Sequence, residues 1–352
     1  MIETDALVIG AGPVGLFAVF ELGLQGVAAQ VVDVLEEAGG QCIALYPDKP
    51  IYDIPGVPVC TGRELTHKLL QQIAPFKPGM HLGQQVNALE RQPDGRWLVS
   101  TTRFQQPAQQ FLTHTVIIAA GVGAFVPKEL RVDGFGEFLG QQAFYRFAPP
   151  AACAGKHVVI VGGEDEAVAN ALTLATTGPN QAKSVTLLHR RDVLQASSDQ
   201  LTKLAALREA GRINFVAGQI TTVHTTDGVL SSVAVTTPDD QTLYLPMDTL
   251  LICLGISPKL GPVAQWGLEM ERKQLCVSVD TFATSAPGIF AVGDVITYPG
   301  KKKLIVSGFH EATLAAFAAA ALIHPEASTV LQYTTSSALL QQRLGVKPMG
   351  NA

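Results

Sequence analysis

The sequence is poor in charged residues and in cysteine. Charged residues make up 16% of the 352 residues and the net charge is −5, which argues against a general nucleic-acid-binding protein. The five cysteines, none of which forms a C-x-x-C pair, are Cys42, Cys60, Cys153, Cys253 and Cys276. This scattered set predicts neither a zinc cluster or other metal site nor a local redox dithiol. It fits reduced, mostly buried thiols in a cytoplasmic protein.

Targeting and membrane-spanning signals are also lacking. Residues 1–5 contain no basic region ahead of the first apolar run, so we expect no signal peptide. The longest expected apolar helix, Ala312–Ile323, is too short to span a bilayer and is interpreted as a core helix, so we expect no membrane association. Hydrophobic residues are plentiful at 47%, which predicts large buried cores in two or three domains and excludes a disordered chain.

The most informative stretch lies at the N-terminus. Ala6–Ile9 is an apolar run typical of a buried parallel strand, and Leu16–Leu24 after it is predicted to be a helix. Between them stands the pattern G-x-G-x-x-G, formed by Gly10, Gly12 and Gly15 with Pro13 inside it. These glycines allow a tight turn, close approach of a pyrophosphate, and close packing of helix against strand. The helix N-terminus would then face the phosphates.

A second strand supports a nucleotide site rather than a glycine-rich turn of an unrelated α/β protein. Ala29–Val32 is apolar and ends at Asp33, whose carboxylate is placed to bind a ribose hydroxyl. Gly39-Gly40-Gln41 follows, and paired glycines let the backbone pass close to a large flat group. Tyr46 is suited to stack on an aromatic ring system, or equally to pack under a loop.

The same order of elements then repeats. After a hinge at Gly121–Gly123, Lys156–Val161 predicts another buried strand, which runs into Gly162-Gly163 and a helix. A further strand ends at His189-Arg190-Arg191. Two nucleotide folds in one chain imply two dinucleotides brought face to face.

The two halves differ in the charge at the end of the second strand. The first half has Asp33 there, whereas the second has Arg190 and Arg191, which suit a 2′-phosphate and favour NADP over NAD. The alternative is a solvated basic pair at a strand end. Glu164 opposes phosphate binding, because it stands where the pattern asks for a second glycine. Its side chain either turns to solvent or weakens the binding of the cofactor.

The end of the chain returns to the first nucleotide site. Gly293-Asp294 ends a strand, where a carboxylate can accept hydrogen bonds from a ribityl chain. Glu311-Ala312 are expected to open a helix whose N-terminus faces a flavin ring. Lys301–Lys303 is either a solvated loop or a docking patch for an acidic redox partner. In the tail, Tyr333 followed by hydroxyl residues could cover a flavin face.

Taken together, the motifs resemble those of the ferredoxin/flavodoxin–NADP reductases built on the thioredoxin-reductase architecture. The resemblance covers essentially the whole chain and is carried by G10-x-G-x-x-G15, Gly39-Gly40-Gln41, Leu45-Tyr46-Pro47, Tyr52-Asp53-Ile54-Pro55-Gly56, His189-Arg190-Arg191-Asp192, Gly293-Asp294, Gly308-Phe309-His310-Glu311-Ala312 and the Tyr333–Ser337 tail. It implies an α/β fold with two Rossmann-like three-layer nucleotide-binding domains, one inserted in the other. The FAD domain would comprise residues 1–124 and 251–352, the NADP(H) domain residues 125–250, and the enzyme would be a homodimer.

The resemblance also implies roles for individual residues. Tyr46 would stack on one flavin face, Tyr333 from the partner subunit would cover the other, and Thr335 or Ser336 would lie near flavin N5. The implied FAD site comprises Gly10, Gly12, Pro13, Gly15, Asp33, Gln41, Tyr46, Val86, Gly121, Asp294, Glu311 and Thr335. The implied NADP site comprises Gly162, Gly163, Asp165, His189, Arg190 and Arg191. Gln142–Phe147 lacks the dithiol of thioredoxin reductases, and Gln195 stands where the family usually has a further arginine.

The main hypothesis is therefore an FAD enzyme that moves electrons between NADPH and a one-electron carrier, ferredoxin or flavodoxin. Two alternatives remain open at this stage. One is an NADPH-dependent diaphorase or quinone reductase with a small-molecule acceptor. The other is a flavin-containing binding or sensor protein with a degenerate second site, for which Glu164 is the motivating feature.

Overall fold

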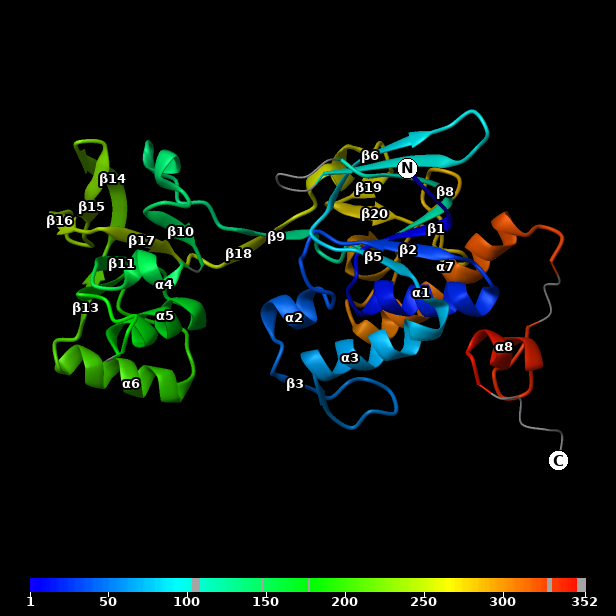
Figure 1. Ribbon diagram of the computed structural model, residues 1–352, viewed down its shortest axis with the longest axis horizontal. Coiled ribbons are helices and arrows are strands. Elements are labelled where there is room, and N and C mark those ends of the chain that lie inside the picture. The colour runs from blue at the N-terminus through cyan, green and yellow to red at the C-terminus, as the bar shows by residue number, and fades with distance from the viewer. Residues whose placement is uncertain (103–107, 147, 177, 328–330, 347–352) are drawn as a thin grey trace. The chain divides into compact units, whose positions relative to one another are not determined.

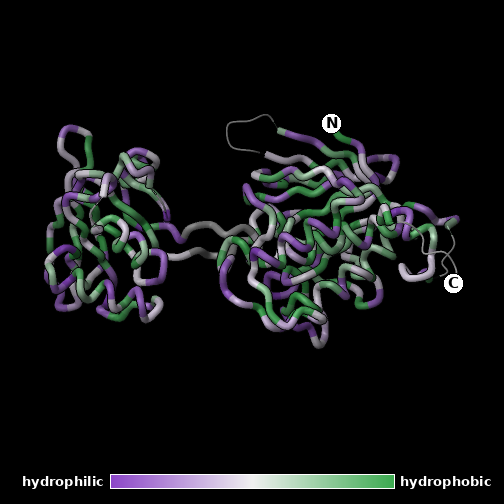
Figure 2. The backbone as a smooth tube through the Cα atoms, turned by 60° about the horizontal axis from the view of Figure 1, so that its bottom comes forward, coloured by the Kyte–Doolittle hydropathy of each residue, from purple (hydrophilic) through white to green (hydrophobic). Residues whose placement is uncertain are grey.

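The computed structural model describes residues 1–102, 108–146, 148–176, 178–327 and 331–346 (Figure 1). The chain divides into two compact units. Unit 1 comprises Met1–Ala124 and Pro258–Ala352, and unit 2 is the inserted segment Phe125–Ser257. Figure 2 shows hydrophobic segments running through the interior of each unit, with hydrophilic segments in many of the peripheral loops.

The second boundary lies later in the chain than the sequence suggested. Strand β17 (Thr249–Ile252) pairs in parallel with β10 (Ala143–Tyr145) and β11 (His157–Val161), both of which belong to unit 2. Residues 251–257 therefore belong to unit 2 and not to unit 1, because β17 completes the sheet of the inserted unit.

Unit 1 is organised around a sheet with the order β5-β2-β1-β8-β7-β6, in which β21 also pairs with β8. These strands are β1 (Ile2–Ile9), β2 (Ala29–Val32), β5 (Gly79–His81), β6 (Gln85–Arg91), β7 (Trp97–Thr102), β8 (Gln110–Ile118) and β21 (Ile289–Ala291). Strands β5, β2, β1, β8 and β21 pair in parallel, and the β6–β7–β8 meander is antiparallel. The parallel core is apolar on both faces, which is why Ala6–Ile9 reads as a continuous hydrophobic run.

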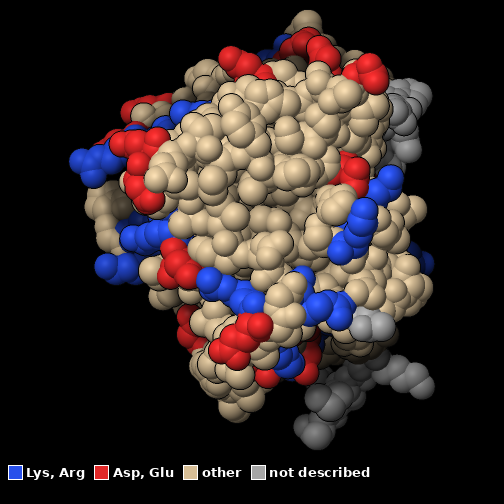
Figure 3. Space-filling view, turned by 90° about the vertical axis from the view of Figure 1, so that its left-hand side faces the viewer, with Lys and Arg blue, Asp and Glu red and all other residues tan. Residues whose placement is uncertain are grey.

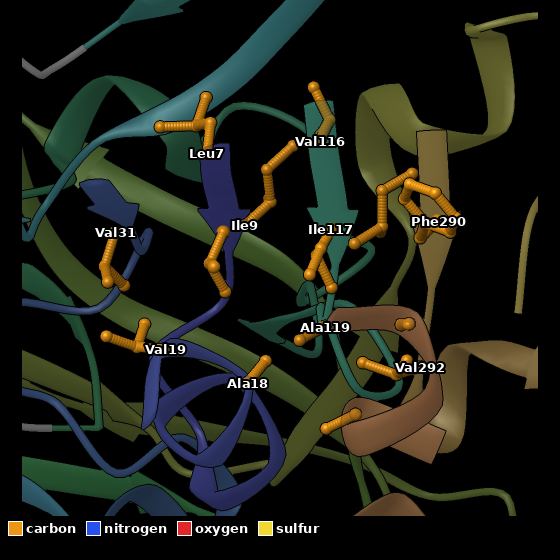
Figure 4. Close-up of a cluster of buried hydrophobic side chains, with 14 of the residues drawn as sticks. Leu7, Ile9, Ala18, Val19, Val31, Val116, Ile117, Ala119, Phe290 and Val292 are labelled. Carbon is orange, nitrogen blue, oxygen red and sulfur yellow. The ribbon is translucent and has the colours of Figure 1, made fainter. Parts of the chain in front are cut away.

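Helices α1 (Pro13–Gln25) and α7 (Ile305–Ile323) pack against each other in unit 1, with the rings of Phe17 and Phe309 4.7 Å apart. Figure 4 shows how Ala18 and Val19 of α1 lie close to the central strands and their buried side chains. Helix α3 (Gly62–Ile73) begins with a capping box formed by Thr61 and Glu64.

Helix α7 is longer than the sequence suggested. It begins at Ile305 and not at Glu311, and its 19 residues are long and apolar enough to span a membrane by length and composition. Its packing is that of a core helix, since Ala312, Ala315 and Ala319 are fully buried in the core of unit 1 and Glu311 is buried among polar partners.

Unit 2 has three layers. Its central parallel sheet has the order β10-β17-β11-β12-β13, with β12 (Ser184–His189) and β13 (Ile213–Ala217). Helices α4 (Pro150–Cys153), α5 (Asp165–Ala175) and α6 (Ser198–Glu209) accompany it. A second, antiparallel sheet consists of β14 (Gln219–Thr226), β15 (Val229–Thr236) and β16 (Thr242–Pro246). Val158 and Ile160 of β11 pack with α5 and α6, whereas Val159 and Val161 pack with the second sheet.

No charged residue occurs within β14, β15 or β16. A broad uncharged area accordingly occupies the upper part of the face of unit 2 seen in Figure 3, and Lys, Arg, Asp and Glu side chains gather in its lower part.

The remaining elements are short. They are α2 (Gln41–Leu45), β3 (Pro50–Ile51), β4 (Cys60–Thr61), η1 (Ala74–Phe76), β9 (Ala124–Pro127), η2 (Phe135–Phe138), β18 (Ile256–Lys259), η3 (Gly261–Gln265), β19 (Met270–Glu271), β20 (Gln274–Cys276), η4 (Gly293–Val295), β22 (Ile296–Thr297) and α8 (Ala338–Arg343). Strands β9 and β18 pair where the chain passes between the units, beside the glycines predicted as a hinge.

Candidate cofactor sites

The three glycines of the first motif, Gly10, Gly12 and Gly15, have different structural roles. Gly10 has φ +113°, and a Cβ atom added there would lie 2.3 Å from the Ala119 carbonyl oxygen. A Cβ at Gly15 would lie 1.9 Å from the Gly10 oxygen, so strand and helix can pack only around glycine. Among the described residues other than its two chain neighbours, only Gly40 comes within 4 Å of a Cβ added at Gly12, with its Cα at 3.8 Å. Gly12 thus leaves room for a ligand, where Gly10 and Gly15 leave none.

Gly12 also caps the N-terminus of α1. It makes no side-chain capping bond, and Pro13 occupies the first helical turn. The first N–H groups of the helix therefore have no side-chain acceptor from the N-cap, which suits a phosphate ligand. The turn has the shape that the sequence predicted, and phosphate binding at it stays a prediction.

Asp33 has a structural role that the sequence did not reveal. Its Oδ2 accepts a hydrogen bond of 2.6 Å from the Ala11 N–H, and its Oδ1 accepts one of 2.8 Å from the Leu35 N–H. Burial raises the pKa of this carboxyl group, although the backbone hydrogen bonds act in the opposite direction. Asp33 therefore ties the glycine turn to the end of β2, and its contact with a ribose stays a prediction.

Three predicted residues from distant parts of the chain meet at one place. The Gln41 Nε2 donates to Asp294 Oδ2 at 3.2 Å, and a Cβ added at Gly121 would lie 3.3 Å from the same Nε2. Gly39 lies close by, because its N–H donates to the Ala11 oxygen at 2.8 Å. The segment 39–41 thereby links the glycine turn to the Gly293-Asp294 loop.

Tyr46 belongs to the same neighbourhood. It ends α2 and is half-buried, and the Cys42 Sγ donates to its hydroxyl oxygen at 3.6 Å. Burial raises the pKa of Tyr46, with smaller contributions from Cys42 and from the negative charge of Asp294. Cys42 is a contact that sequence reasoning missed, and the i, i+4 spacing within a short helix was the available signal.

Val86, which was also predicted to contribute to the FAD site, lies in the core of unit 1. It lies in β6, pairs with Thr101 and is buried in the core of unit 1. Its contribution to FAD binding stays a prediction, since no described hydrogen bond connects it to the Gln41–Asp294 pair.

Glu311 does not open a helix, contrary to the sequence expectation. It is fully buried in the second turn of α7, where Oε2 accepts from the Gly293 N–H at 2.7 Å. Its Oε1 accepts from the Tyr298 hydroxyl at 2.9 Å and from the Lys301 Nζ. Glu311 therefore holds the loop that carries Asp294, and the N-terminus of α7 is formed at Leu304 and Ile305. Burial and the bond to Glu311 raise the pKa of Tyr298 to about 12.

The lysine run is divided by this arrangement. The Lys301 side chain is only 6% exposed because it is paired with Glu311, whereas Lys302 and Lys303 are exposed. The segment is therefore not a fully solvated loop, because the Lys301 side chain is buried. It is not a continuous patch of three lysines either, because only Lys302 and Lys303 are exposed.

The C-terminal tail lies away from Tyr46 in this chain. Tyr333 is 64% exposed, and Thr335 and Ser336 are exposed as well. The tail is tied to the far end of α1, because Arg343 on α8 donates to the Leu24 carbonyl oxygen. Figure 1 shows α8 at the opposite side of unit 1 from α2. The structure thus does not bring the three predicted tail residues to the Gln41–Asp294 pair.

The second glycine turn, in unit 2, is more tightly filled than the first. A Cβ at Gly162 would lie 2.1 Å from the Cys253 oxygen, and one at Gly163 would lie 2.7 Å from three ring atoms of His189. His189 thus packs directly on the turn. Its pKa is lowered by burial and by the positive charges of Arg190 and Arg191.

Glu164 is exposed at the N-cap of α5 without a side-chain capping bond. Its carboxylate lies beside Gly255, where an added Cβ would be 3.2 Å from Oε2. Gln195 lies against the same turn, because its N–H donates to the Gly163 oxygen at 2.7 Å. Asp165, the other predicted acidic residue, accepts from the Ser197 N–H at 3.2 Å.

Arg190 and Arg191 are exposed at the end of β12 and form no ion pair with an acidic residue in the described part of the chain. Next to them, Asp192 is held by both terminal nitrogens of Arg208, at 3.0 and 2.8 Å. No group of three or more potential metal-ligating side chains occurs among the described residues.

These two glycine turns, each between a parallel strand and a helix, define a protein with two dinucleotide-type sites. The chain belongs to the pyridine nucleotide-disulphide oxidoreductase family, whose pattern it matches over residues 4–319. It is 55% identical to the ferredoxin–NADP reductase of Polaromonas sp. over 346 residues, covering 98% of this chain and 93% of that protein. It is also 55% identical to the ferredoxin–NADP reductase of Albidiferax ferrireducens, with coverages of 98% and 97%.

Solved structures with the same fold are more distant in sequence. The thioredoxin reductase of T. acidophilum has a TM-score of 0.60 at 20% identity, covering 91% of this chain and 99% of that chain. The bacillithiol disulfide reductase of Bacillus cereus has a TM-score of 0.62 at 16% identity, with coverages of 91% and 99%. These likenesses establish the thioredoxin-reductase-like α/β fold.

Proposed function

We propose that this chain is an FAD-dependent ferredoxin–NADP reductase. The observation that carries the proposal is the convergence of Gln41, Gly121 and Asp294 beside the open turn at Gly12, together with a second glycine turn flanked by Arg190 and Arg191. The ferredoxin–NADP reductases that are more than half identical over nearly the whole chain support the same activity.

The residues of unit 1 fit FAD. Apart from its chain neighbours, Gly40 is the one described residue within 4 Å of a Cβ added at Gly12, so a pyrophosphate would have room against the N-terminus of α1. Asp294 and Gln41 offer a carboxylate and an amide for hydrogen bonds to the ribityl chain, and Tyr46 offers a ring for stacking. Bound FAD supplies hydride exchange with a nicotinamide and single-electron transfer to a carrier. These side chains would hold it in place.

The residues of unit 2 fit NADP(H). Arg190 and Arg191 suit the 2′-phosphate, and the N-terminus of α5 suits the pyrophosphate. Glu164 is the opposing feature, and its exposed position beside Gly255 lets its carboxylate remain hydrated while the cofactor binds.

The acceptor is ferredoxin, in line with the names of the relatives, with flavodoxin as the other carrier of the same kind. Lys302 and Lys303 present exposed positive charge after Tyr298 and are the part of the lysine run suited to an acidic carrier. The five cysteines are free thiols, which suits a reducing compartment, and we place the enzyme in the cytoplasm without membrane association.

We further infer a homodimer. Tyr333, Thr335 and Ser336 are exposed and lie on the side of unit 1 away from α2, so a flavin beside Tyr46 is left without them in a single chain. A second copy that donates its tail would complete the site, with Tyr333 covering the ring and the hydroxyls near N5.

Anaerobic mixing of the FAD-loaded protein with NADPH tests the proposal. NADPH should bleach the flavin absorbance much faster than NADH does at equal concentration, and the reduced protein should then reduce ferredoxin. A flavin that NADPH does not bleach would contradict the reductase activity, and preferential reduction of quinones would contradict the carrier assignment.

A further inference from the structure

An acidic residue directly follows the two arginines that we assign to the 2′-phosphate. Asp192 comes three residues after the end of β12, next to Arg190 and Arg191 in the same loop. Its side chain is 54% exposed, so burial does not keep it from these neighbours. Opposite charges at such spacing attract each other, and a carboxylate paired with an arginine competes with a phosphate for the same N–H donors. The loop thus contains a charge that opposes the binding of NADP(H).

Arg208, in the last turn of α6, binds this carboxylate with both terminal nitrogens. Its Nη1 donates to Oδ1 of Asp192 at 3.0 Å and its Nη2 donates to Oδ2 at 2.8 Å. This bidentate arrangement is the strong form of an arginine–carboxylate contact. The hydrogen bonds from Arg208 lower the pKa of Asp192 below its ordinary value, so the pair joins two full charges at neutral pH. Both oxygens of Asp192 are therefore held by α6.

Arg208 is the better-fixed partner of this pair. Its Cζ lies 4.5 Å from the centroid of the Phe215 ring, and its side chain is 33% exposed. Phe215 lies on β13, pairs with Leu187 of β12 and packs against the core of unit 2. An aromatic face attracts a guanidinium, and the end of a helix favours positive charge. Asp192 is therefore drawn towards α6 and β13.

The backbone of the loop after β12 is held by other contacts. The Gln195 N–H donates to the Gly163 oxygen at 2.7 Å, and the Ser197 N–H donates to Asp165 Oδ1 at 3.2 Å. At its other end the loop continues from β12, which pairs with β11 and β13. None of these contacts involves Arg208. The ion pair can therefore be lost without releasing the loop, and its main effect is on the charges within it.

We propose that Arg208 is a positioning residue that determines the preference for NADP(H) over NAD(H). By binding both oxygens of Asp192, it keeps this carboxylate from occupying Arg190 and Arg191, which then remain free for the 2′-phosphate. NAD(H) lacks that phosphate, so its binding does not depend on Arg208. This inference rests on the NADP(H) site proposed above.

The test is equilibrium binding of NADP⁺ and NAD⁺ to the full-length, FAD-loaded protein by calorimetry. Arg208→Gln should weaken NADP⁺ binding by about three- to tenfold, the range expected when an exposed carboxylate competes for an arginine, and leave NAD⁺ binding unchanged. Adding Asp192→Asn to this variant should restore the affinity for NADP⁺, because the competing charge is then gone. Asp192→Asn alone should bind NADP⁺ at least as tightly as the wild type.

Lys203→Gln is the matched control. Lys203 lies on the same helix, where its Nζ donates to Asp199 Oδ2 at 2.7 Å. Its loss removes the same charge and frees a carboxylate away from the arginines, so NADP⁺ affinity should equal that of the wild type. If Arg208→Gln does not fold, judged by its melting temperature, Arg208→Lys replaces it. This variant should show a smaller loss of NADP⁺ affinity, because a lysine lacks the planar fork.

Three results would overturn the inference while leaving the reductase intact. They are unchanged NADP⁺ affinity in the Arg208 variant, an equal loss for NAD⁺, and a double variant that binds NADP⁺ no better than the single one. Arg190→Gln tests the site itself and should weaken NADP⁺ binding whatever the role of Arg208. Unchanged NADP⁺ affinity in Arg190→Gln would overturn the location of the 2′-phosphate, and the inference with it.

Discussion

The buried carboxylate of Glu311 accepts a hydrogen bond of 2.7 Å from the backbone N–H of Gly293. Gly293 has φ +81° and precedes Asp294, the residue paired with Gln41. An acidic side chain in the second turn of an apolar helix thus sets the position of the loop that we assign to FAD. Lys301 and Tyr298 complete the arrangement by binding the second carboxylate oxygen.

The first prediction concerns this buried pair. Glu311→Gln should lower the free energy of unfolding by about 3 kcal/mol, because it leaves the buried Lys301 ammonium without a counter-charge. It should also weaken retention of FAD, since the Gly293-Asp294 loop loses its anchor. Chemical denaturation and fluorescence of released flavin measure the two effects. The double variant Glu311→Gln with Lys301→Met should recover part of the stability, and a single variant as stable as the wild type would contradict this role.

A second prediction distinguishes the structural role of Gly15 from the ligand-binding role of Gly12. Gly15→Ala should destabilise the protein even without FAD, because its Cβ would collide with the Gly10 oxygen. Gly12→Ala should leave the apoprotein as stable as the wild type and impair FAD binding, because its Cβ would enter the space assigned to the pyrophosphate. Thermal melts of the apoproteins, followed by FAD titration, distinguish them. Equal behaviour of the two variants would count against the cradle at Gly12.

The third prediction is a dependence of stability on pH through His189. Its folded pKa is below the ordinary value of 6.5, so the unfolded chain binds the proton more tightly. The associated stability is present above pH 6.5 and is lost as the pH falls through the folded pKa. His189→Gln should therefore show a smaller loss of unfolding free energy on acidification below that value. Parallel urea melts across this range provide the measurement, and identical slopes for both proteins would refute the assignment.

A fourth prediction tests the contribution of the tail across subunits. If Tyr333 of the partner subunit covers the flavin, Tyr333→Ala should alter the flavin absorbance spectrum and the rate of hydride transfer. Diluting the wild type until it dissociates should produce the same spectral change, whereas dilution of the variant should not. Sedimentation at matched concentrations gives the oligomeric state. A wild-type spectrum that is independent of dissociation would contradict a shared site.

Both glycine turns could be predicted from the sequence because their signals are local. The order strand, G-x-G-x-x-G, helix and second strand is contiguous, so Gly10, Gly12 and Gly15 could be assigned to particular duties before any contact was known. The opposite charges of Asp33 and Arg190 could also be recognised from the sequence, since each residue follows a predicted strand. The repeat itself gave the two-unit organisation.

Other features depend on residues that are far apart in the chain. Glu311 can be buried inside α7 because Lys301 and the backbone N–H of Gly293 bind its carboxylate. Hydrophobic periodicity gives no information about either contact, so it could not predict where the helix begins. The chain passes from unit 2 back to unit 1 after residue 257, because β17 pairs with β10 and β11 of unit 2. An apolar run in the sequence does not specify which strands it will pair with. The Arg146–Glu166 pair arises in the same way, where two strand ends meet at one edge of a sheet. Local pattern determined the two glycine turns, and only tertiary packing decided which charged side chains surround them, because those side chains meet through pairing across the sheet.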